Sequence, residues 1–315
     1  MAGAAMSALS LTPRRRLGVR GLQRQATAAA ADGSVEGPAE GGGKVRTSLR
    51  RSPRAAAPAG ERNGALRTVV CADAVAWLEQ RESLPSVVTS LPDVSELQGP
   101  PLFITSAAQY KSWFRKTVST IVSKLSPGSV AVFAQTDTVR DGEFINKSFL
   151  CAAGAEDAGG RPLWHKIALR REVGLISFGK MPGFTHWLAF ESPRGGLARA
   201  KNGAVGVPDV IHRGDVVWSK AMGVDAAVWT ARFLRHDIGA KEVCDPFCGS
   251  GTMLAAANHL GMDAIGVELS AKRARHAMLM QLYRTEDGEL IARRSSDRAP
   301  DGAEDDDADA SEPEL

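Results

Sequence analysis

The chain has few of the residues that build metal centres. Its 315 residues include four cysteines and six histidines, with no Cys-x-x-Cys pair and no histidine cluster. Zinc sites draw their ligands from such groupings, so the sequence predicts no metal site. Cys71 and Cys244 lie in apolar strand patterns, where we expect buried thiols.

Long apolar runs are also absent. No segment reaches the length of a membrane-spanning helix, and the N-terminus lacks the apolar stretch of a secretory signal. The sequence therefore predicts neither a membrane protein nor a secreted one. It also contains no zinc-finger, helix-turn-helix or RNA-binding signature.

Acidic residues are missing from residues 1–31, which contain five arginines and many Ala, Ser and Thr residues. Plastid and mitochondrial transit peptides have this composition, and an ordinary basic, disordered tail is the alternative. Residues 6–12 are rich in Ser, Thr and Ala before the arginines begin. We therefore expect a chloroplast location, with the mitochondrion as the alternative, and interpret residues 1–60 as transit peptide and disordered linker.

Charge is distributed unevenly along the chain. Residues 1–54 carry ten Lys and Arg against three acids, whereas residues 297–315 carry one Arg against nine acids. Both ends lack the apolar periodicity of packed elements, which predicts disorder. One domain is expected over residues 61–290, followed by a disordered acidic tail over residues 291–315.

The most informative segment is residues 241–270, KEVCDPFCGSGTMLAAANHLGMDAIGVELS. A short strand pattern ends at Asp245, a glycine turn follows, a helical stretch begins at Thr252, and a second strand pattern ends at Glu268. Ligands of open α/β sheets bind at the carboxyl ends of the strands, where Glu268 is placed to accept hydrogen bonds from ribose hydroxyls. Glycine in the turn allows the backbone to approach a ligand closely. The segment therefore predicts a nucleoside-cofactor site.

The type of cofactor can be narrowed further. A P-loop needs Lys and Ser or Thr after its last glycine, but Thr252-Met253 follows here; a dinucleotide fingerprint needs a third glycine where Leu254 stands. The leading Asp-Pro-Phe resembles the cofactor motif of S-adenosylmethionine (SAM) methyltransferases, in the variant common among nucleic-acid amino-methyltransferases. An unspecialised βαβ unit with a Gly-x-Gly turn is the alternative. The resemblance implies that SAM is held by Asp245, Phe247, Gly249, Gly251, Thr252 and Glu268.

The order of the expected elements supports a particular fold. Strands are predicted at residues 67–71, 86–90, 129–135, 163–169 and 186–190 before the glycine motif, and helices at 74–81, 106–123, 144–151, 220–234 and 272–283. In an unpermuted class I methyltransferase the glycine motif comes first, but here it comes near the end. Over residues 66–284 the chain resembles the DNA amino-methyltransferases and their RNA-directed relatives. The implied fold is α/β, a circularly permuted, Rossmann-like class I methyltransferase sheet with disordered termini.

That resemblance also places two further cofactor residues. Asp73 takes the position of the acid that meets the adenine amino group. Lys220, in the segment Trp-Ser-Lys-Ala-Met, aligns with the part of permuted enzymes that meets the methionine end of the cofactor. There it would face the carboxylate in a charge-assisted contact, or it would only start a helix.

The catalytic candidates follow from the same alignment. The resembled families carry Asp, Asn or Ser followed by Pro-Pro and an aromatic residue after the fourth strand; the first residue accepts a hydrogen bond from the target amino group, and the aromatic stacks on a flipped base. This chain has Ser90-Leu91-Pro92-Asp93, which implies Ser90, Pro92 and Asp93 as the catalytic set. Asp93 replaces the aromatic residue, so it would act as a base or hold a substrate amine. The alternative is a Pro-Asp turn that caps the next segment.

A second, more distant resemblance rests on several short strings. TSLPD, AQTD, WHK, HWLAF, AMG, DPFCGSGT and GVELS are similar to a little-characterised family of SAM-dependent methyltransferases of bacteria and plastid-bearing eukaryotes. The family implies methyl transfer but no particular substrate.

Six other residues have two interpretations each. Gln135 and Asp137 either line the pocket or close a turn, and residues 164–166 either bind nucleic acid or form a half-exposed strand face. His186 has no visible partner in the sequence, which favours a structural role over that of a catalytic base.

The basic region at residues 161–220 carries ten Lys and Arg against four acids. Such a surface suits a phosphate backbone, although another anionic substrate or plain solvation would also explain it. Because the core leaves little room for a large target-recognition domain, RNA is favoured over DNA. We therefore expect SAM-dependent methyl transfer to a nitrogen of a base in organellar RNA or DNA. The alternatives are a methyltransferase acting on a protein or small molecule, and a SAM-binding protein without catalytic activity.

Overall fold

The computed structural model describes residues 64–99, 102–175, 182–197 and 208–295. All of them belong to the unit that begins at Arg51. The expected transit peptide and most of the expected acidic tail lie outside the described residues.

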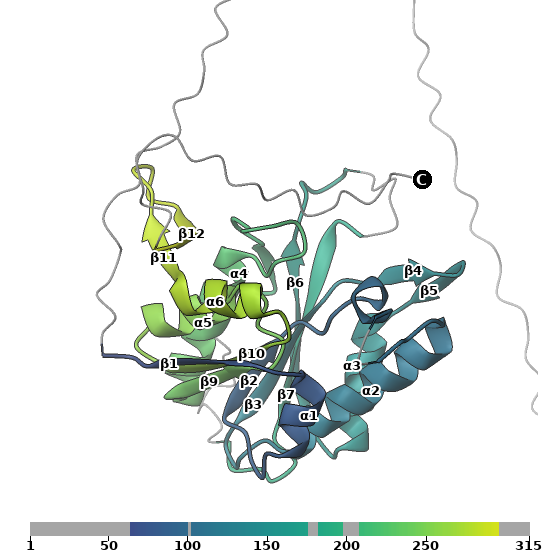
Figure 1. The fold of residues 1–315 in the computed structure, drawn as a ribbon. Helices are drawn as coiled ribbons and strands as arrows, with labels where there is room; N and C mark the ends of the chain where they lie inside the picture. Colours follow the sequence, from purple (N-terminus) through teal and green to yellow (C-terminus); the bar gives the residue numbers. More distant parts are fainter. Residues whose placement is uncertain (1–63, 100–101, 176–181, 198–207, 296–315) are drawn as a thin grey trace, which may run out of the picture. The chain divides into compact units, whose positions relative to one another are not determined.

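An eight-stranded sheet organises the described residues (Figure 1). Five neighbouring strands are parallel to one another, the sixth is antiparallel to both of its neighbours, and the last two pair parallel with each other. Across the sheet the order is β1 (Arg67–Cys71), β10 (Asp263–Glu268), β9 (Glu242–Asp245), β2 (Ser86–Thr89), β3 (Val130–Gln135), β7 (Phe184–Glu191), β6 (Arg161–Leu169) and β8 (Val210–His212). The α/β class expected from the sequence is thus confirmed.

Helices cover both faces of this sheet (Figure 1). One face carries α1 (Ala74–Glu79), α2 (Ala107–Ser123) and α3 (Lys147–Asp157); the other carries α4 (Val224–Arg232), α5 (Thr252–His259) and α6 (Ala271–Leu279). The described residues also form two short helical elements, the 3₁₀ helix η1 (Val94–Leu97) and the π-helix η2 (Phe233–Ile238), which continues α4. Because parallel strands need crossover connections, most helices lie between successive strands.

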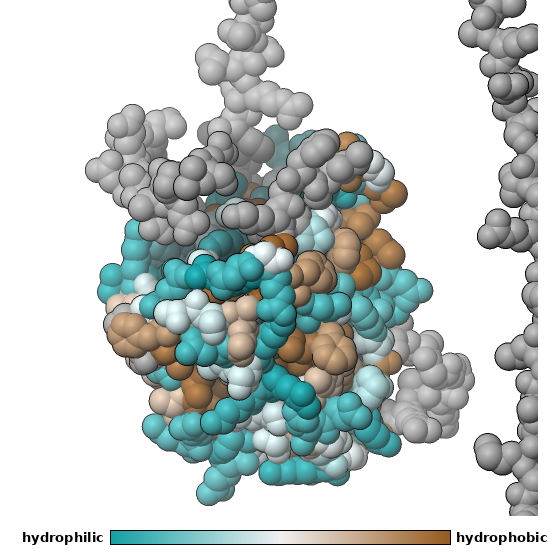
Figure 2. Space-filling model, turned by 90° about the vertical axis from the view of Figure 1, so that its right-hand side faces the viewer, coloured by the Kyte–Doolittle hydropathy of each residue, from teal (hydrophilic) through white to brown (hydrophobic). Residues whose placement is uncertain are grey.

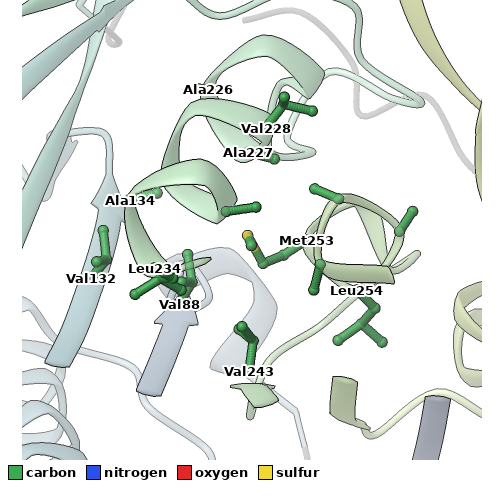
Figure 3. Close-up of a cluster of buried hydrophobic side chains, with 14 of the residues drawn as sticks. Val88, Val132, Ala134, Ala226, Ala227, Val228, Leu234, Val243, Met253 and Leu254 are labelled. Atoms are coloured by element: carbon green, nitrogen blue, oxygen red, sulfur yellow. The ribbon is translucent and has the colours of Figure 1, made fainter. Parts of the chain in front are cut away.

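The central strand β3 shows how the sequence specifies a two-sided sheet. All six of its residues are buried. Val130, Val132 and Ala134 enter the core beneath α4 and α5, whereas Ala131 and Phe133 enter the core beneath α1, α2 and α3. A strand buried on both faces reads as a continuous apolar run rather than as an alternation. Figure 3 shows the first of these cores, in which Val88, Val132 and Val243 from three strands meet Met253 and Leu254 of α5.

The position of β9 brings the glycine motif to the middle of the sheet. β9 comes late in the chain, yet it lies between β10 and β2. Among the described residues, the first strand is β1, which pairs only with β10 and forms the edge of the sheet. From β9 the chain continues to β10 on one side, and from β2 it continues to β3 on the other side. The boundary between β9 and β2 is therefore the point where the strand order reverses, and open α/β sheets bind ligands at such a point.

The C-terminal helix is shorter than the sequence pattern indicated. Residues 272–283 were expected to be helical, but α6 ends at Leu279 and Met280 is already extended. A hairpin follows, in which β11 (Met280–Arg284) pairs with β12 (Leu290–Arg294). Leu282 and Ala292 of the hairpin are buried against the core of α4 and α5, and this tertiary contact overrides the local alanine-rich pattern. The hairpin also extends past residue 290, the expected end of the domain.

Two other expected helices differ at their starts. Residues 144–151 begin with β5 (Glu143–Ile145), which pairs with β4 (Thr138–Arg140), and α3 starts only after Asn146 has capped it through the Phe149 N–H at 2.9 Å. The helix expected over residues 220–234 starts at Val224. Helix propensity alone would include these residues, but strand pairing takes them in the first case and a turn takes them in the second.

The side of the molecule formed by α2, α3 and the β4–β5 hairpin faces the viewer in Figure 2. Hydrophilic side chains cover much of it, with hydrophobic ones gathered between them. Three aromatic residues between residues 102 and 157 are exposed: Phe103, Phe144 and Phe149.

Candidate active site

A cavity of about 500 Å³ opens at the carboxyl ends of the parallel strands. Cavities that bind small molecules and cofactors have about this volume. Most of the cofactor residues expected from the sequence line it: Asp73, Lys220, Asp245, Phe247, Gly249, Thr252 and Glu268. Ser90 and Pro92 from the catalytic candidates line it too, so segments far apart in the chain meet at one place.

Glu268 is held in a fixed orientation at the end of β10. Its Oε2 accepts the Gly249 N–H at 3.1 Å, and its Oε1 accepts the Ser270 N–H at 2.9 Å. Each carboxylate oxygen retains acceptor capacity beyond one such bond. The side chain is therefore a preoriented acceptor for a diol or another pair of hydroxyls.

The two turn glycines expected to approach a cofactor have different roles. Gly249 has φ +53°, and a Cβ built there would meet nothing within 4 Å, consistent with its position on the cavity wall. Gly251 has φ +86°, and a Cβ there would lie 2.7 Å from the Ala277 Cα of α6. Gly251 does not line the cavity. A glycine is required at this position because the backbone is left-handed and because α6 packs closely against it.

Asp245 is a buried carboxylate at the end of β9, only 3% exposed. Its Oδ1 accepts the Thr89 hydroxyl at 2.7 Å and the Phe247 N–H at 3.1 Å. Burial raises the pKa of Asp245 to about 7, with the nearby Glu268 carboxylate adding to the rise and the two hydrogen bonds opposing it. A cationic ligand beside Asp245 would lower this pKa, because it stabilises the charged form of the carboxyl.

Asp73 follows β1 and begins α1. Its Oδ1 accepts the Ala76 N–H at 2.8 Å, so the side chain caps the helix. The Ala72 N–H also donates to the Glu268 carbonyl at 3.1 Å. The ends of β1 and β10 are thus fixed beside each other, and both acids face the same cavity.

Aromatic side chains form part of the cavity wall. Trp113 of α2 meets Phe247 edge to face, with ring centroids 6.2 Å apart. Arg273 of α6 lies over Trp218, 5.6 Å from the ring centroid, and its guanidinium is 3.9 Å from Glu96. The sequence reasoning missed Trp113, Glu96 and Arg273, because no local motif marks them.

A second cavity of about 80 Å³ adjoins the first. The two share several lining residues: Ser90, Leu91, Glu96, Lys220, Ala221 and Met222. Lys220 precedes α4 by four residues rather than starting it. Ser90 therefore stands at the junction of the two cavities, and its hydroxyl has no hydrogen-bond partner within the described part of the chain.

Asp93 lines only the second cavity. Its Oδ1 lies 2.6 Å from Nζ of Lys147, a side chain only 4% exposed. The Asp93 N–H donates to Glu96 Oε2 at 2.9 Å as η1 begins. Asp93 thus begins a helical turn, which agrees with the alternative interpretation of Pro92-Asp93 as a turn that caps the next segment. Its carboxylate is also ion-paired and lines the cavity.

His186 has partners that the sequence did not reveal. Its Nε2 is 2.9 Å from Asp137 Oδ2, and its Nδ1 is 2.9 Å from His165 Nε2. Asp137 also accepts the Lys147 N–H at 2.7 Å. Although burial raises the pKa of Asp137, the hydrogen bonds from His186 and Lys147 outweigh it and leave that pKa lowered. Of the ambiguous strand-end residues, Gln135 lines the second cavity, whereas Asp137 closes the turn into α3.

The residues at 164–166 have separate environments. Trp164 packs edge to face on Phe233 at 5.3 Å, and Lys166 pairs with Asp209. Cys71, expected to be buried, is exposed because it ends the edge strand β1, whereas Cys244 in the central strand β9 is buried. In the described ranges no cluster of three or more His, Cys, Asp or Glu side chains is arranged to hold a metal ion. Within the same ranges no helix combines the length and apolarity needed to cross a membrane.

Comparison with known proteins gives a short family match and several structural matches. Residues 240–279, which contain β9, α5 and β10, match a family described as DNA methylase. No match was found among curated proteins.

Two solved structures illustrate the likeness of fold. PvuII DNA methyltransferase, cytosine-N4-specific, has a TM-score of 0.54 and 15% identity, covering 68% of this chain and 86% of its own. A proposed DNA modification methylase from Thermus thermophilus has a TM-score of 0.50 and 18% identity, covering 67% of this chain and 92% of its own. The fold is therefore that of DNA methyltransferase structures.

Proposed function

We propose that the chain is a SAM-dependent methyltransferase that methylates a nitrogen of a base in nucleic acid. The observation that carries the proposal is the 500 Å³ cavity, where the Asp-Pro-Phe-Cys-Gly-Ser-Gly turn, Glu268 and Asp73 meet Ser90 and Pro92. The sheet order supports a circularly permuted class I arrangement, because the glycine motif lies late in the chain and centrally in the sheet. The family match at residues 240–279 falls on the same motif.

The residues present fit SAM. The Glu268 carboxylate suits the ribose hydroxyls, and the Asp73 carboxylate beside it suits an adenine amino group. Trp113 and Phe247 provide apolar surface for the purine ring. Asp245 and Lys220 provide one group of each charge for the methionine end, which carries an ammonium and a carboxylate. Bound SAM would supply an electrophilic methyl group.

The acceptor side of the reaction is assigned to the second cavity. Ser90 at the junction accepts a hydrogen bond from the acceptor amino group and fixes its lone pair toward the methyl carbon. Pro92 keeps the Ser90–Asp93 segment extended, and its carbonyl accepts the Tyr110 hydroxyl at 3.0 Å. Asp93 holds the amino group or takes its proton, with Lys147 beside it. In such a reaction most of the rate acceleration comes from positioning the two reacting atoms.

RNA is the nucleic acid we favour, within a chloroplast or alternatively a mitochondrion. Apart from the main sheet and its helices, the described residues form only two hairpins and short helical turns. A sequence-reading module of the kind used on DNA grooves is not apparent in those residues. The acid-free N-terminus supports organelle targeting.

Calorimetry on the full chain tests the cofactor assignment. SAM and its demethylated product should bind at one site, whereas ATP and NAD should bind far more weakly. Tighter binding of ATP or NAD than of SAM would contradict the assignment of SAM as the cofactor. The acceptor is tested separately by methyl transfer: label from SAM in nucleic acid supports the proposal, and label in protein alone opposes it.

A further inference from the structure

Two residues that line the second cavity carry buried side-chain hydrogen-bond donors that the described part of the protein does not satisfy. Gln135 is 1% exposed, and its Nε2 has no hydrogen-bond partner among the described residues. The same is true of the Trp187 Nε1, and Trp187 is 3% exposed. Buried donors without partners are uncommon and costly. Two of them beside one small cavity indicate a ligand that brings acceptors.

Two arginines add positive charge to the same cavity. Arg170 and Arg213 directly follow Leu169 and His212, which are paired residues on the parallel strands β6 and β8. The Arg213 N–H donates to the Leu169 carbonyl at 2.9 Å. The two arginines therefore emerge beside each other from neighbouring strand ends. Neither guanidinium forms an ion pair with a carboxylate in the part of the chain that the structure describes.

The pKa directions agree with this geometry. Burial lowers the pKa of both Arg170 and Arg213, and Arg170 itself lowers that of Arg213 further. Among the described residues, no carboxylate acts on either pKa in the opposite direction. Two half-buried like charges held together are unfavourable unless a counter-charge joins them.

The other charged side chains at the cavity do not supply that counter-charge. Asp93 is paired with Lys147, and Glu96 accepts the Asp93 N–H and faces Arg273. Lys220 at the junction of the two cavities adds another cation. The lining therefore has an excess of positive charge together with unsatisfied neutral donors.

We propose that Arg170 and Arg213, with the Gln135 and Trp187 N–H groups, form a subsite for one phosphate group of the methyl acceptor. The cavity of about 80 Å³ suits a group of a few heavy atoms, since one water molecule occupies roughly 30 Å³ in the liquid. Guanidinium forks match phosphate oxygens in pairs. The inference rests on the proposed function, because the phosphate would fix the acceptor strand beside Ser90.

The test uses inorganic phosphate and the full chain saturated with the demethylated cofactor. The wild-type protein should bind phosphate at one site by ³¹P NMR titration. The double variant Arg170→Gln/Arg213→Gln should bind it roughly 10- to 100-fold more weakly. Arg235→Gln is the matched control, because Arg235 is exposed and lines neither cavity. Arg170→Lys, which keeps the charge but loses the fork, should show an intermediate loss and guards against misfolding of the double variant.

A second arm identifies the source of the phosphate. Inorganic phosphate should compete with an acceptor oligonucleotide in the transfer reaction. Removing the 5′-terminal phosphate of that oligonucleotide abolishes the competition if the subsite takes a strand end, and preserves it if the subsite takes an internal phosphodiester. Either result supports a phosphate subsite, whereas transfer indifferent to phosphate overturns it.

Failure of this inference is distinguishable from failure of the proposed function. Equal phosphate binding by wild type and double variant, with cofactor binding and transfer intact, would remove the subsite alone. Absence of cofactor binding in the wild-type protein would remove the methyltransferase assignment itself.

Discussion

The Nζ of Lys147 lies 2.6 Å from Oδ1 of Asp93, and the lysine side chain is almost completely buried. This contact joins the start of α3 to the Ser-Leu-Pro-Asp segment after β2, 54 residues apart in the chain. The resembled amino-methyltransferases carry an aromatic residue where Asp93 stands. The aspartate at this position forms an ion pair, which supports the proposal that its role is electrostatic rather than stacking.

Asp93→Ala should lower turnover roughly 10²–10⁴-fold while changing SAM affinity little, if Asp93 accepts the proton. The reason is that Asp93 lines the second cavity and not the first. Single-turnover rates and calorimetric SAM affinity on the same preparation measure the two effects. Full turnover in this variant on the true acceptor would remove Asp93 from the chemistry.

Lys147→Met should destabilise the fold by about 3 kcal/mol, because it leaves the Asp93 carboxylate partly buried without its partner. Asp93→Asn/Lys147→Met should recover much of that loss, since neither side chain then carries a charge. Urea unfolding of the four proteins in the double-mutant cycle gives the coupling free energy. Additive losses would show that the pair does not act as a unit.

Glu268→Ala should weaken SAM binding by roughly 1.5–3 kcal/mol, the value of hydrogen bonds to a charged group. Calorimetry measures the loss. Glu79→Ala provides the control, because Glu79 is exposed at the end of α1 and lines neither cavity. Unchanged SAM affinity in Glu268→Ala would exclude the ribose assignment.

Asp245 gives a pH-dependent prediction. Its folded pKa of about 7 lies above the unfolded value of roughly 4, so the folded state binds the proton more tightly. Stability should therefore fall as pH rises from about 4 through 7, because the buried group ionises. Asp245→Asn should gain up to about 4 kcal/mol over wild type across that range, at about 1.4 kcal/mol per pKa unit.

The same variant should lose SAM affinity, since a cationic ligand favours the ionised carboxylate. Thermal unfolding at pH 4, 6 and 8 checks the first effect, and calorimetry at pH 8 checks the second. If the difference in stability between Asp245→Asn and wild type stays constant with pH, the Asp245 carboxyl does not titrate in this range.

The two turn glycines make a matched pair of variants. Gly251→Ala should destabilise the protein more than Gly249→Ala, because only the former places its Cβ 2.7 Å from Ala277. Both pay the penalty of a left-handed backbone, about 1–2 kcal/mol. Gly249→Ala should instead reduce SAM affinity, since Gly249 lines the cavity. Denaturant midpoints and SAM titrations separate the effects, and the reverse ranking would contradict these roles.

The sequence predicted that several residues of the first cavity lie together, because those residues are close in the chain. Asp245, Gly249, Thr252 and Glu268 fall within one βαβ unit, so spacing alone places them together. The helix ends were less predictable, as at Leu279, where hairpin packing ended a pattern that favoured more helix.

The second cavity, to which the acceptor is assigned in our proposal, depends on contacts between distant segments. Lys147 meets Asp93, and Arg170 and Arg213 meet through the pairing of β6 and β8. The sequence showed an excess of basic residues over 161–220, but not which of them were already neutralised. Arg161 and Lys166 pair with Glu191 and Asp209, and those pairings are set by strand register. Such information exists only in the folded chain.

The most direct test of the central claim is methyl transfer from tritiated SAM. The full chain is incubated with RNA, DNA and protein fractions from cells lacking it, with Glu268→Ala as the control. The account predicts label in nucleic acid, RNA above DNA, that nuclease removes and that mass spectrometry places on a base nitrogen; the variant should label weakly at limiting SAM. Label confined to protein and insensitive to nuclease, or no label despite tight SAM binding, would contradict it.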